Sequence, residues 1–304
     1  MTPEADSTET FEEALSNPEV SAIKLTGDIQ ITRPEQIGHK LDIDLNGHTI
    51  TASVNNALFT VNGGELTLHG DGTISNRKWI ASGTNNGTVT VNGGNYVSQN
   101  EGFIASGGGS IIFNDGHISC AECGLNAAGN AHVEFNGGLI ETSDNMGIAT
   151  NGSPGRGGNT IVMNGGKIDA SIRTSGYEAI GLYIANSDVF VMNDGEIVAN
   201  GGTGLCMRGG DVTINGGKIT ATKYSKSGAE VPDGKIADKD TVMYGCAAII
   251  YDEAAGYPER AGMRLNVKGG TITGDEYSVQ VLSTEEEPQV FVTGGTLTPA
   301  YPAA

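Results

Sequence analysis

The sequence predicts an all-β fold, a single-stranded parallel β-helix of about ten coils that follows a short N-terminal capping helix. Three observations predict it. One short unit recurs along the chain, each unit holds two alternating strands around a turn, and a third strand lies between successive units. We expect a cap over residues 1–24 and one continuous β-helix over residues 25–304.

The recurring unit is a strand, an Asn-Gly turn and a second strand. In the first strand, apolar residues such as Val89 and Val91 alternate with variable ones, as expected when one face meets a core. The turn residues tolerate positive φ, so the motif is a backbone requirement. The copies are IDLNGHTI (43–50), FTVNGGEL (59–66), VTVNGGNY (89–96), IIFNDGHI (111–118), VEFNGGLI (133–140), IVMNGGKI (161–168), FVMNDGEI (190–197), VTINGGKI (212–219), LNVKGGTI (265–272) and VFVTGGTL (290–297).

The third strand of each coil sets the coil length. Turn asparagines lie 22 residues apart from Asn92 to Asn114 to Asn136, which is too short for a propeller blade of about 40 to 45 residues. Ten such coils, stacked about 4.8 Å apart, make a rod of roughly 50 Å. The third strands are expected at 102–106, 123–127, 146–150, 180–184, 203–207, 246–250 and 277–281.

The turn asparagines predict a ladder. If the coils stack, each side-chain amide can donate to the asparagine one coil away and so satisfy groups that are half-buried. The predicted column comprises Asn62, Asn92, Asn114, Asn136, Asn164, Asn193 and Asn215.

The segment STETFEEALSNP predicts the capping helix. It begins with Ser and Thr candidates for the N-cap and places Phe11, Ala14 and Leu15 on one helical face. Such a helix would cover the open end of the core and prevent pairing between exposed strand edges.

The repeat pattern resembles the right-handed parallel β-helix superfamily, which includes pectate lyases and phage tailspikes, over about residues 25–298. The resemblance implies a right-handed coil but no activity, because the superfamily holds lyases, hydrolases, adhesins and virion proteins. HGDGTISN (69–76) resembles a structural turn of polygalacturonase-type hydrolases. The other motifs of those enzymes, and the calcium ligands and arginine base of pectate lyases, are not recognisable.

Charge and hydropathy exclude several partners. The chain has 36 acidic and 17 basic residues and a formal net charge of −19, which repels nucleic acids and anionic membranes. No apolar run is long enough to span a membrane, and the acidic N-terminus does not resemble a secretion signal. An earlier removal of such a signal is left open.

The outward column of the third strands holds no carboxylate. Hydrolysis of a glycosidic bond usually needs two carboxyl groups about 5 to 9.5 Å apart. We therefore predict no catalytic residue and no cofactor. The column comprises Ile104, Asn126, Ala149, Tyr183, Cys206, Ile249 and Gln280.

Apolar members of that column predict a partner interface. Ile104, Tyr183 and Ile249 would form an exposed seam on a soluble rod, suited to a homo-oligomer such as a trimer. A covering loop and a sugar-binding cleft are the alternatives. The longest insertion, 222–245, adds a basic cluster that could dock on an acidic partner or stay solvated; its lysines are Lys223, Lys226, Lys235 and Lys239.

Three residues outside the repeat rule have spacing that could supply zinc ligands: His117, Cys120 and Cys123. A fourth ligand is not evident, and Cys123 occupies a coil position that Met146 fills elsewhere. We therefore predict that the cysteines are small core residues and that no metal binds here. Whether the two cysteines are paired, metal-bound or free is left open.

These observations predict a non-enzymatic surface protein. We favour a bacteriophage capsid decoration or head-fibre protein on the virion surface, attached to the capsid or another surface protein and able to contact a cell-surface glycan. The alternatives are a secreted pectate-lyase-like polysaccharide lyase or hydrolase and an extracellular bacterial cell-surface adhesin.

Overall fold

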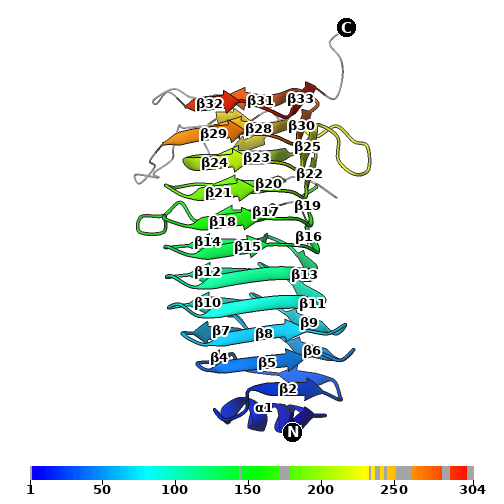
Figure 1. Ribbon diagram of the computed structural model, residues 1–304. Coiled ribbons are helices and arrows are strands. Elements are labelled where there is room, and N and C mark those ends of the chain that lie inside the picture. Colours follow the sequence, from blue (N-terminus) through cyan, green and yellow to red (C-terminus); the bar gives the residue numbers. More distant parts are fainter. Residues whose placement is uncertain are drawn as a thin grey trace.

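The protein is a parallel β-solenoid of about eleven turns with one helix near its N-terminus (Figure 1). The computed structural model describes residues 2–143, 145–171, 179–232, 234–236, 240–242, 245–250, 262–282 and 288–299. The all-β class, the parallel stacking and the N-terminal helix are confirmed.

The helix α1 (Thr8–Ser16) closes the first coil, as expected. Ser7 is its N-cap: the Ser7 hydroxyl accepts from the backbone N–H of Thr10 at 3.4 Å, and the Thr10 hydroxyl accepts from the N–H of Ser7 at 3.2 Å. Phe11, Ala14 and Leu15 are buried against the solenoid core. Strand β1 (Glu4–Ala5) pairs with the first coil strand, so the cap also covers a backbone edge.

Each coil contributes one strand to each of three parallel stacks, which we call the first, second and third sheets. The first sheet contains β2 (Ala22–Leu25), β5 (Lys40–Asp44), β8 (Glu65–His69), β11 (Thr88–Ser98), β13 (Ser110–Cys120), β15 (His132–Phe135), β18 (Thr160–Met163), β21 (Val189–Met192), β24 (Gly210–Ile214), β29 (Met263–Val267) and β32 (Gln289–Val292). Strands β11 and β13 continue through the corner into the second sheet.

The other two sheets complete the coils. The second contains β3 (Ile29–Ile31), β6 (Thr49–Ala52), β9 (Thr73–Asn76), β16 (Leu139–Thr142), β19 (Lys167–Asp169), β22 (Glu196–Asn200), β25 (Lys218–Thr222), β30 (Thr271–Gly274) and β33 (Thr296–Pro299). The third contains β4 (Glu35–Ile37), β7 (Phe59–Asn62), β10 (Ala81–Thr84), β12 (Phe103–Ser106), β14 (Cys123–Ala128), β17 (Met146–Thr150), β20 (Ile180–Ile184), β23 (Thr203–Met207), β28 (Cys246–Ile250) and β31 (Tyr277–Val281). A separate antiparallel pair joins β26 (Gly234–Ile236) and β27 (Asp240–Val242).

Glycine at the second position of the third strands follows from close packing. A Cβ on Gly181 would lie 2.1 Å from Cγ2 of Ile197, and one on Gly204 would lie 2.4 Å from Cγ2 of Ile219. No side chain fits at those distances, because core atoms already meet near van der Waals contact. The recurring glycine therefore lets the second and third sheets approach each other.

Six asparagines form a continuous ladder at the corner between the first and second sheets. Each Nδ2 donates to the Oδ1 one coil earlier: Asn114 to Asn92 at 2.8 Å, Asn136 to Asn114 at 2.8 Å, Asn164 to Asn136 at 2.7 Å, Asn193 to Asn164 at 2.7 Å and Asn215 to Asn193 at 2.8 Å. The amides thus satisfy one another along the axis.

Asn62 does not belong to this ladder, so that member of the predicted column is wrong. It ends β7 in the third sheet and accepts from Nδ2 of Asn85 at 3.0 Å. The reason is that 59–66 spans a different corner: Glu65 already pairs with Lys40 and Thr88 in the first sheet. The same Asn-Gly-Gly turn therefore serves two corners.

The ladder predicts unequal costs for two asparagines. Asn136→Ala removes two donated bonds, to Asn114 and, at 3.5 Å, to Glu134, and one accepted bond, whereas Asn215→Ala removes only its bond to Asn193. We expect Asn136→Ala to lower the free energy of unfolding by about 1–2 kcal/mol and Asn215→Ala by about half as much. Urea denaturation of both variants tests this, and equal losses would contradict it.

Candidate functional site

The predicted seam on the third sheet is buried within the chain. Its register is as expected, since Ile104 pairs with Asn126, and Tyr183 and Ile249 both pair with Cys206. However, Tyr183 is only 5 % exposed and Ile249 is fully buried, in a second hydrophobic cluster outside the main core. The proposed partner interface through these two residues is therefore wrong, because their apolar surface is already covered. Ile104 is half-buried.

A groove of about 360 Å³ lies beside this second cluster. Two carboxylates line it, Glu101 just before β12 and Glu122 just before β14. Asparagine amides and the Tyr183 side chain complete a mostly polar wall; the asparagines are Asn126, Asn145 and Asn151. This is the groove in which we place the candidate site.

Glu101 is the most perturbed carboxyl of the groove. Burial raises its pKa, and the charge of Glu122 raises it further, while Trp79, Asn126 and Lys78 oppose the rise. Nδ2 of Asn126 donates to Oε1 of Glu101 at 3.4 Å. The carboxyl is therefore poorly solvated although it borders a groove.

Two acceptor atoms of this pair lack hydrogen-bond partners. Oε2 of Glu101 and Oδ1 of Asn126 are both buried, and neither has a partner among the described residues. An unmatched buried acceptor costs about 1–3 kcal/mol. Both atoms are closed off from solvent, so a bound donor would satisfy them once the two side chains turn toward the groove.

The only tryptophan of the chain adjoins this site. Trp79 lies close enough to Glu101 to influence the pKa of its carboxyl, and Nζ of Lys78 lies 4.4 Å from the centroid of the indole ring. Its Nε1 makes no hydrogen bond of ordinary geometry among the described residues, yet it lies near enough to the Glu101 carboxylate to lower the pKa of that group by hydrogen bonding. The site thus combines an aromatic ring with carboxylate and amide groups.

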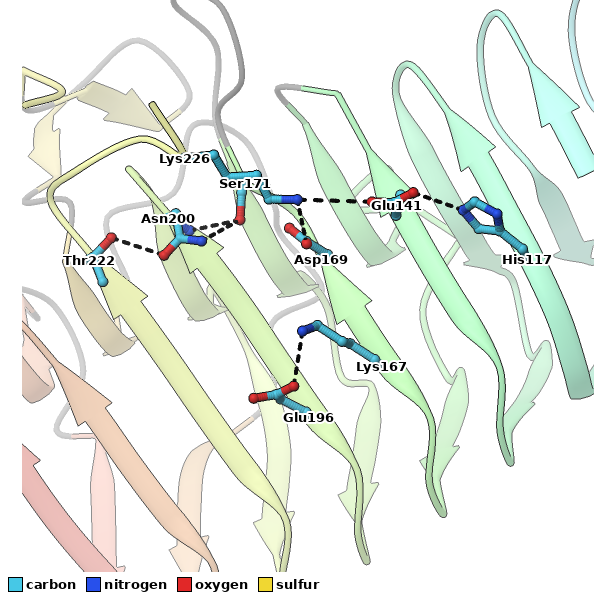
Figure 2. Close-up of polar contacts among 9 residues, drawn as sticks. All are labelled: His117, Glu141, Lys167, Asp169, Ser171, Glu196, Asn200, Thr222 and Lys226. Carbon is cyan, nitrogen blue, oxygen red and sulfur yellow. Dashed lines mark hydrogen bonds and ion pairs between the residues drawn. The ribbon is translucent and has the colours of Figure 1, made fainter. Parts of the chain in front are cut away.

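A second polar surface covers the outer face of the second sheet (Figure 2). Ser119, Glu141 and Asp169 follow one another in an outward row of paired strands. Nε2 of His117 lies 2.9 Å from Oε2 of Glu141. Nζ of Lys226 lies 2.6 Å from Oδ2 of Asp169 and 3.9 Å from Oε1 of Glu141.

Lys226 reaches this row from the segment that follows β25. That strand pairs with β22, which pairs with β19, so the lysine lies back over strands two and three coils earlier. Figure 2 shows its ammonium group between Glu141 and Asp169. The segment is therefore fastened to the sheet by an ion pair.

Asp169 stays ionised in this arrangement. Burial alone would raise its pKa, but hydrogen bonds from Lys226 and Ser171 and the charges of Lys226 and Lys167 together lower it. A general acid needs a raised pKa. Asp169 and Glu141 are therefore better described as ion-pair partners of Lys226 than as a catalytic acid and base.

Neighbouring polar groups on the same face also satisfy one another. The Asn200 side chain donates to the Ser171 hydroxyl at 3.1 Å and accepts from the Thr222 hydroxyl at 3.2 Å. Lys167 pairs with Glu196 at 3.1 Å. In Figure 2 these contacts link adjacent coils, so this face contributes mainly to holding the coils in register.

The sequence analysis missed all four acidic residues described above. It examined only the outward column of the third strands, while Glu101 and Glu122 lie just before those strands. Glu141 and Asp169 lie just beyond the quoted repeat units. Continuing the alternation by one more outward position would have placed both on the second sheet.

His117, Cys120 and Cys123 do not converge. His117 faces outward and contacts Glu141, Cys120 belongs to the main core, and Cys123 belongs to the second cluster. Burial raises the pKa of Cys120 to about 12 and the pKa of Cys123 well above its usual value. Cys120 and Cys123 are free thiols. No group of three or more metal-ligating side chains gathers among the described residues.

The insertion lysines that the structure describes bind the chain itself. Lys223 pairs with Glu276 at 2.9 Å, and Lys226 pairs with Asp169. The Lys235 side chain and Lys239 lie outside the described residues.

Comparison with known families now supplies a second line of evidence. A family model for a pectate lyase-like adhesive domain matches residues 2–231. The chain belongs to this family. Comparisons with curated proteins and with solved structures gave no match.

Membership in this family indicates an adhesin-like protein that lies at a surface or outside the cell. It confirms the resemblance to pectate-lyase-like β-helices. The match contains nothing specific to a capsid decoration or head-fibre protein. In the described part of the adhesive domain, no helix is long and apolar enough to cross a membrane.

The carboxyl pair of the groove predicts a titration change. Glu122→Gln removes the neighbouring negative charge, so the pKa of Glu101 falls. It stays above its usual value, because burial is the larger cause. Carbon-detected NMR titration of the Glu101 carboxyl measures this. Asp115→Asn, an exposed carboxyl at another corner, is the control and leaves the pKa unchanged; a rise in the Glu122→Gln variant would contradict the assignment.

The ion pair between Lys226 and Asp169 predicts a pH-dependent difference in stability between the wild type and a Lys226→Gln variant. The lowered folded-state pKa of Asp169 means that its contribution is present above the unfolded value of about 3.9 and is lost as the pH falls through the folded-state pKa. We expect Lys226→Gln to lower the free energy of unfolding by up to about 1 kcal/mol at pH 7. Denaturation of wild type and variant should show that difference closing below about pH 4.

The control for this experiment is Lys40→Gln, which removes an ion pair to Glu65 between two well exposed side chains. That substitution should have a smaller effect at both pH values, because water screens the pair. A Lys226→Gln difference that persists after the Asp169 carboxyl is protonated, as followed by NMR, would show that the lysine stabilises the chain by packing and not by charge.

Proposed function

We propose that this chain is a non-enzymatic adhesive domain that binds a neutral carbohydrate in the groove beside Glu101. One observation carries the proposal. Glu101 and Asn126 both line the groove, and each has one buried side-chain oxygen atom with no hydrogen-bond partner among the described residues. A ligand would reach these oxygen atoms if the carboxyl and amide groups turn toward the groove. Sugar hydroxyls are donors that would satisfy such acceptors.

The remaining features of the groove suit the same ligand class. Its volume of about 360 Å³ is within the range of about 300 to 1,000 Å³ that small-molecule sites occupy. Tyr183 contributes an aromatic side chain to the lining, and the amides of Asn145 and Asn151 add donors and acceptors. The two carboxylates and the net charge of −19 disfavour an acidic sugar here.

Glycoside cleavage is a second candidate, favoured by one observation. Burial and the charge of Glu122 raise the pKa of Glu101, which is what a general acid requires. The adhesive character of the matched family favours binding without cleavage.

We place the domain on a cell surface in preference to a virion. The family match is to an adhesive domain. The trimeric rod predicted from the sequence depended on an exposed seam, and Tyr183 and Ile249 are buried. Attachment through a glycan is the part of the virion hypothesis that the groove supports.

Calorimetry against neutral oligosaccharides selected on a glycan array tests the proposal. Glu101→Gln replaces an acceptor with an amide of the same shape, so binding should weaken at least about tenfold. Asn126→Leu should weaken it similarly, and Asp115→Asn, at an exposed position outside the groove, should not.

Two outcomes would overturn the proposal. If Glu101→Gln and Asn126→Leu bind as wild type does, the groove is not the site. If the wild type releases reducing ends from a bound oligosaccharide and Glu101→Gln does not, the domain is a glycoside hydrolase with Glu101 as its acid.

A further inference from the structure

A second groove, of about 400 Å³, lies on the outer face of the first sheet at its last two strands. Arg264 and Asn266 of β29 pair with Gln289 and Phe291 of β32, and all four side chains line it. Lys268 and Thr293, just past these strands, complete the wall. The groove belongs to a different sheet from that of Glu101 and lies several coils further along the axis (Figure 1).

Phe291 faces outward at this position. Its neighbours in the strand, Val290 and Val292, pair with the buried core residues Leu265 and Val267, so the alternation turns Phe291 to the outer face. The side chain is 49 % exposed. A single exposed aromatic is common on protein surfaces. Here it forms part of a groove whose other walls are polar or cationic.

Arg264 is held beside the aromatic ring. Its Nε donates to Oε1 of Gln289 at 3.3 Å and lies 3.9 Å from Oδ1 of Asp211, an aspartate whose side chain is half exposed. These contacts use one edge of the guanidinium group, which has five N–H donors. The orientation of the group is therefore fixed while donors remain for a ligand.

Lys268 makes the groove locally cationic. It is exposed and makes no ion pair within the described part of the chain. Two positive charges line one groove of a chain whose net charge is −19. Asp211 offsets part of the Arg264 charge.

We propose that this groove is a second binding site, for a saccharide that carries a carboxylate, such as an oligosaccharide containing glucuronic acid. The Phe291 ring packs against the apolar face of a sugar ring, and Arg264 and Lys268 bind the carboxylate. The side chains of Asn266, Gln289 and Thr293 hydrogen-bond to hydroxyls. A nucleic acid fits less well, because its many phosphates would meet the acidic remainder of the chain.

This site is independent of the groove proposed above. The Glu101 groove offers acceptors to a neutral sugar, whereas this one offers cations to an acidic sugar. Failure of one assignment leaves the other standing, because the variants that test them are separate.

Calorimetry of the full chain with a glucuronate-containing tetrasaccharide, and with the same tetrasaccharide after its carboxylates are reduced to alcohols, tests the proposal. Wild type should bind the acidic form at least about tenfold more tightly than the reduced form, with affinity falling as salt rises. Phe291→Ala should weaken both forms about tenfold. Arg264→Gln and Lys268→Gln should remove the preference for the acidic form.

Matched controls lie on the same sheet. Lys40→Gln removes a positive charge and Val189→Ala trims an exposed apolar side chain in the same outward row as Arg264, and both should bind as wild type does. Equal affinity of wild type for the two tetrasaccharides, or unchanged binding by Arg264→Gln and Phe291→Ala, would overturn the proposal. Because these side chains are exposed, thermal unfolding followed by circular dichroism should show all variants folded. Loss of acidic binding in Glu101→Gln would instead assign both ligands to the first groove.

Discussion

Parallel pairing between successive coils is the constraint on which the rest of the structure depends. Each sheet strand between the end coils is held by the coil before and the coil after, so a side chain occupies the same place as its counterpart one strand spacing, about 4.8 Å, away. That repetition aligns the asparagine amides into a ladder and the apolar residues into a continuous core. It also brings residues far apart in sequence, such as Glu141 and Asp169, into adjacent outward positions.

The same constraint explains where ligands could bind. The inside of the solenoid is filled, so only outward side chains and the segments between coils are free to vary. Both candidate grooves lie where the repeat is interrupted. One adjoins the corner where Glu101 and Glu122 precede their strands, and the other lies at the last two strands of the first sheet. On the polar face of the second sheet most side chains bind one another, although Oδ1 of Asp169 and Oγ1 of Thr220 have no partner among the described residues.

Much of the fold could be predicted from the sequence, because alternation and turn chemistry are local properties. The capping helix and the three strands per coil followed from such patterns. Asn62 was misplaced since a turn motif does not reveal which corner it occupies; only the pairing of Glu65 with its neighbours does. The burial of Tyr183 could not be predicted either. Alternation separates inward from outward residues, but it does not show what covers an outward residue. The Glu101 site was missed for a related reason, since the pKa of Glu101 is raised first by burial and then by the charge of Glu122 in the next coil, and a local pattern shows neither.

Among the described residues a cap covers one end of the solenoid, the N-terminal one, and this gives the described rod a mechanical polarity. Phe11 closes the core at the first coil, whereas the last described coil leaves Val292 and Leu297 substantially exposed. In a stack whose units contact only their neighbours, terminal units have the fewest stabilising contacts. The first and the last described coils lie at opposite ends of the rod (Figure 1). A pulling force along the axis would therefore act on every coil. The last described coil would unfold first under such a force and lengthen the molecule, while the capped end stays folded.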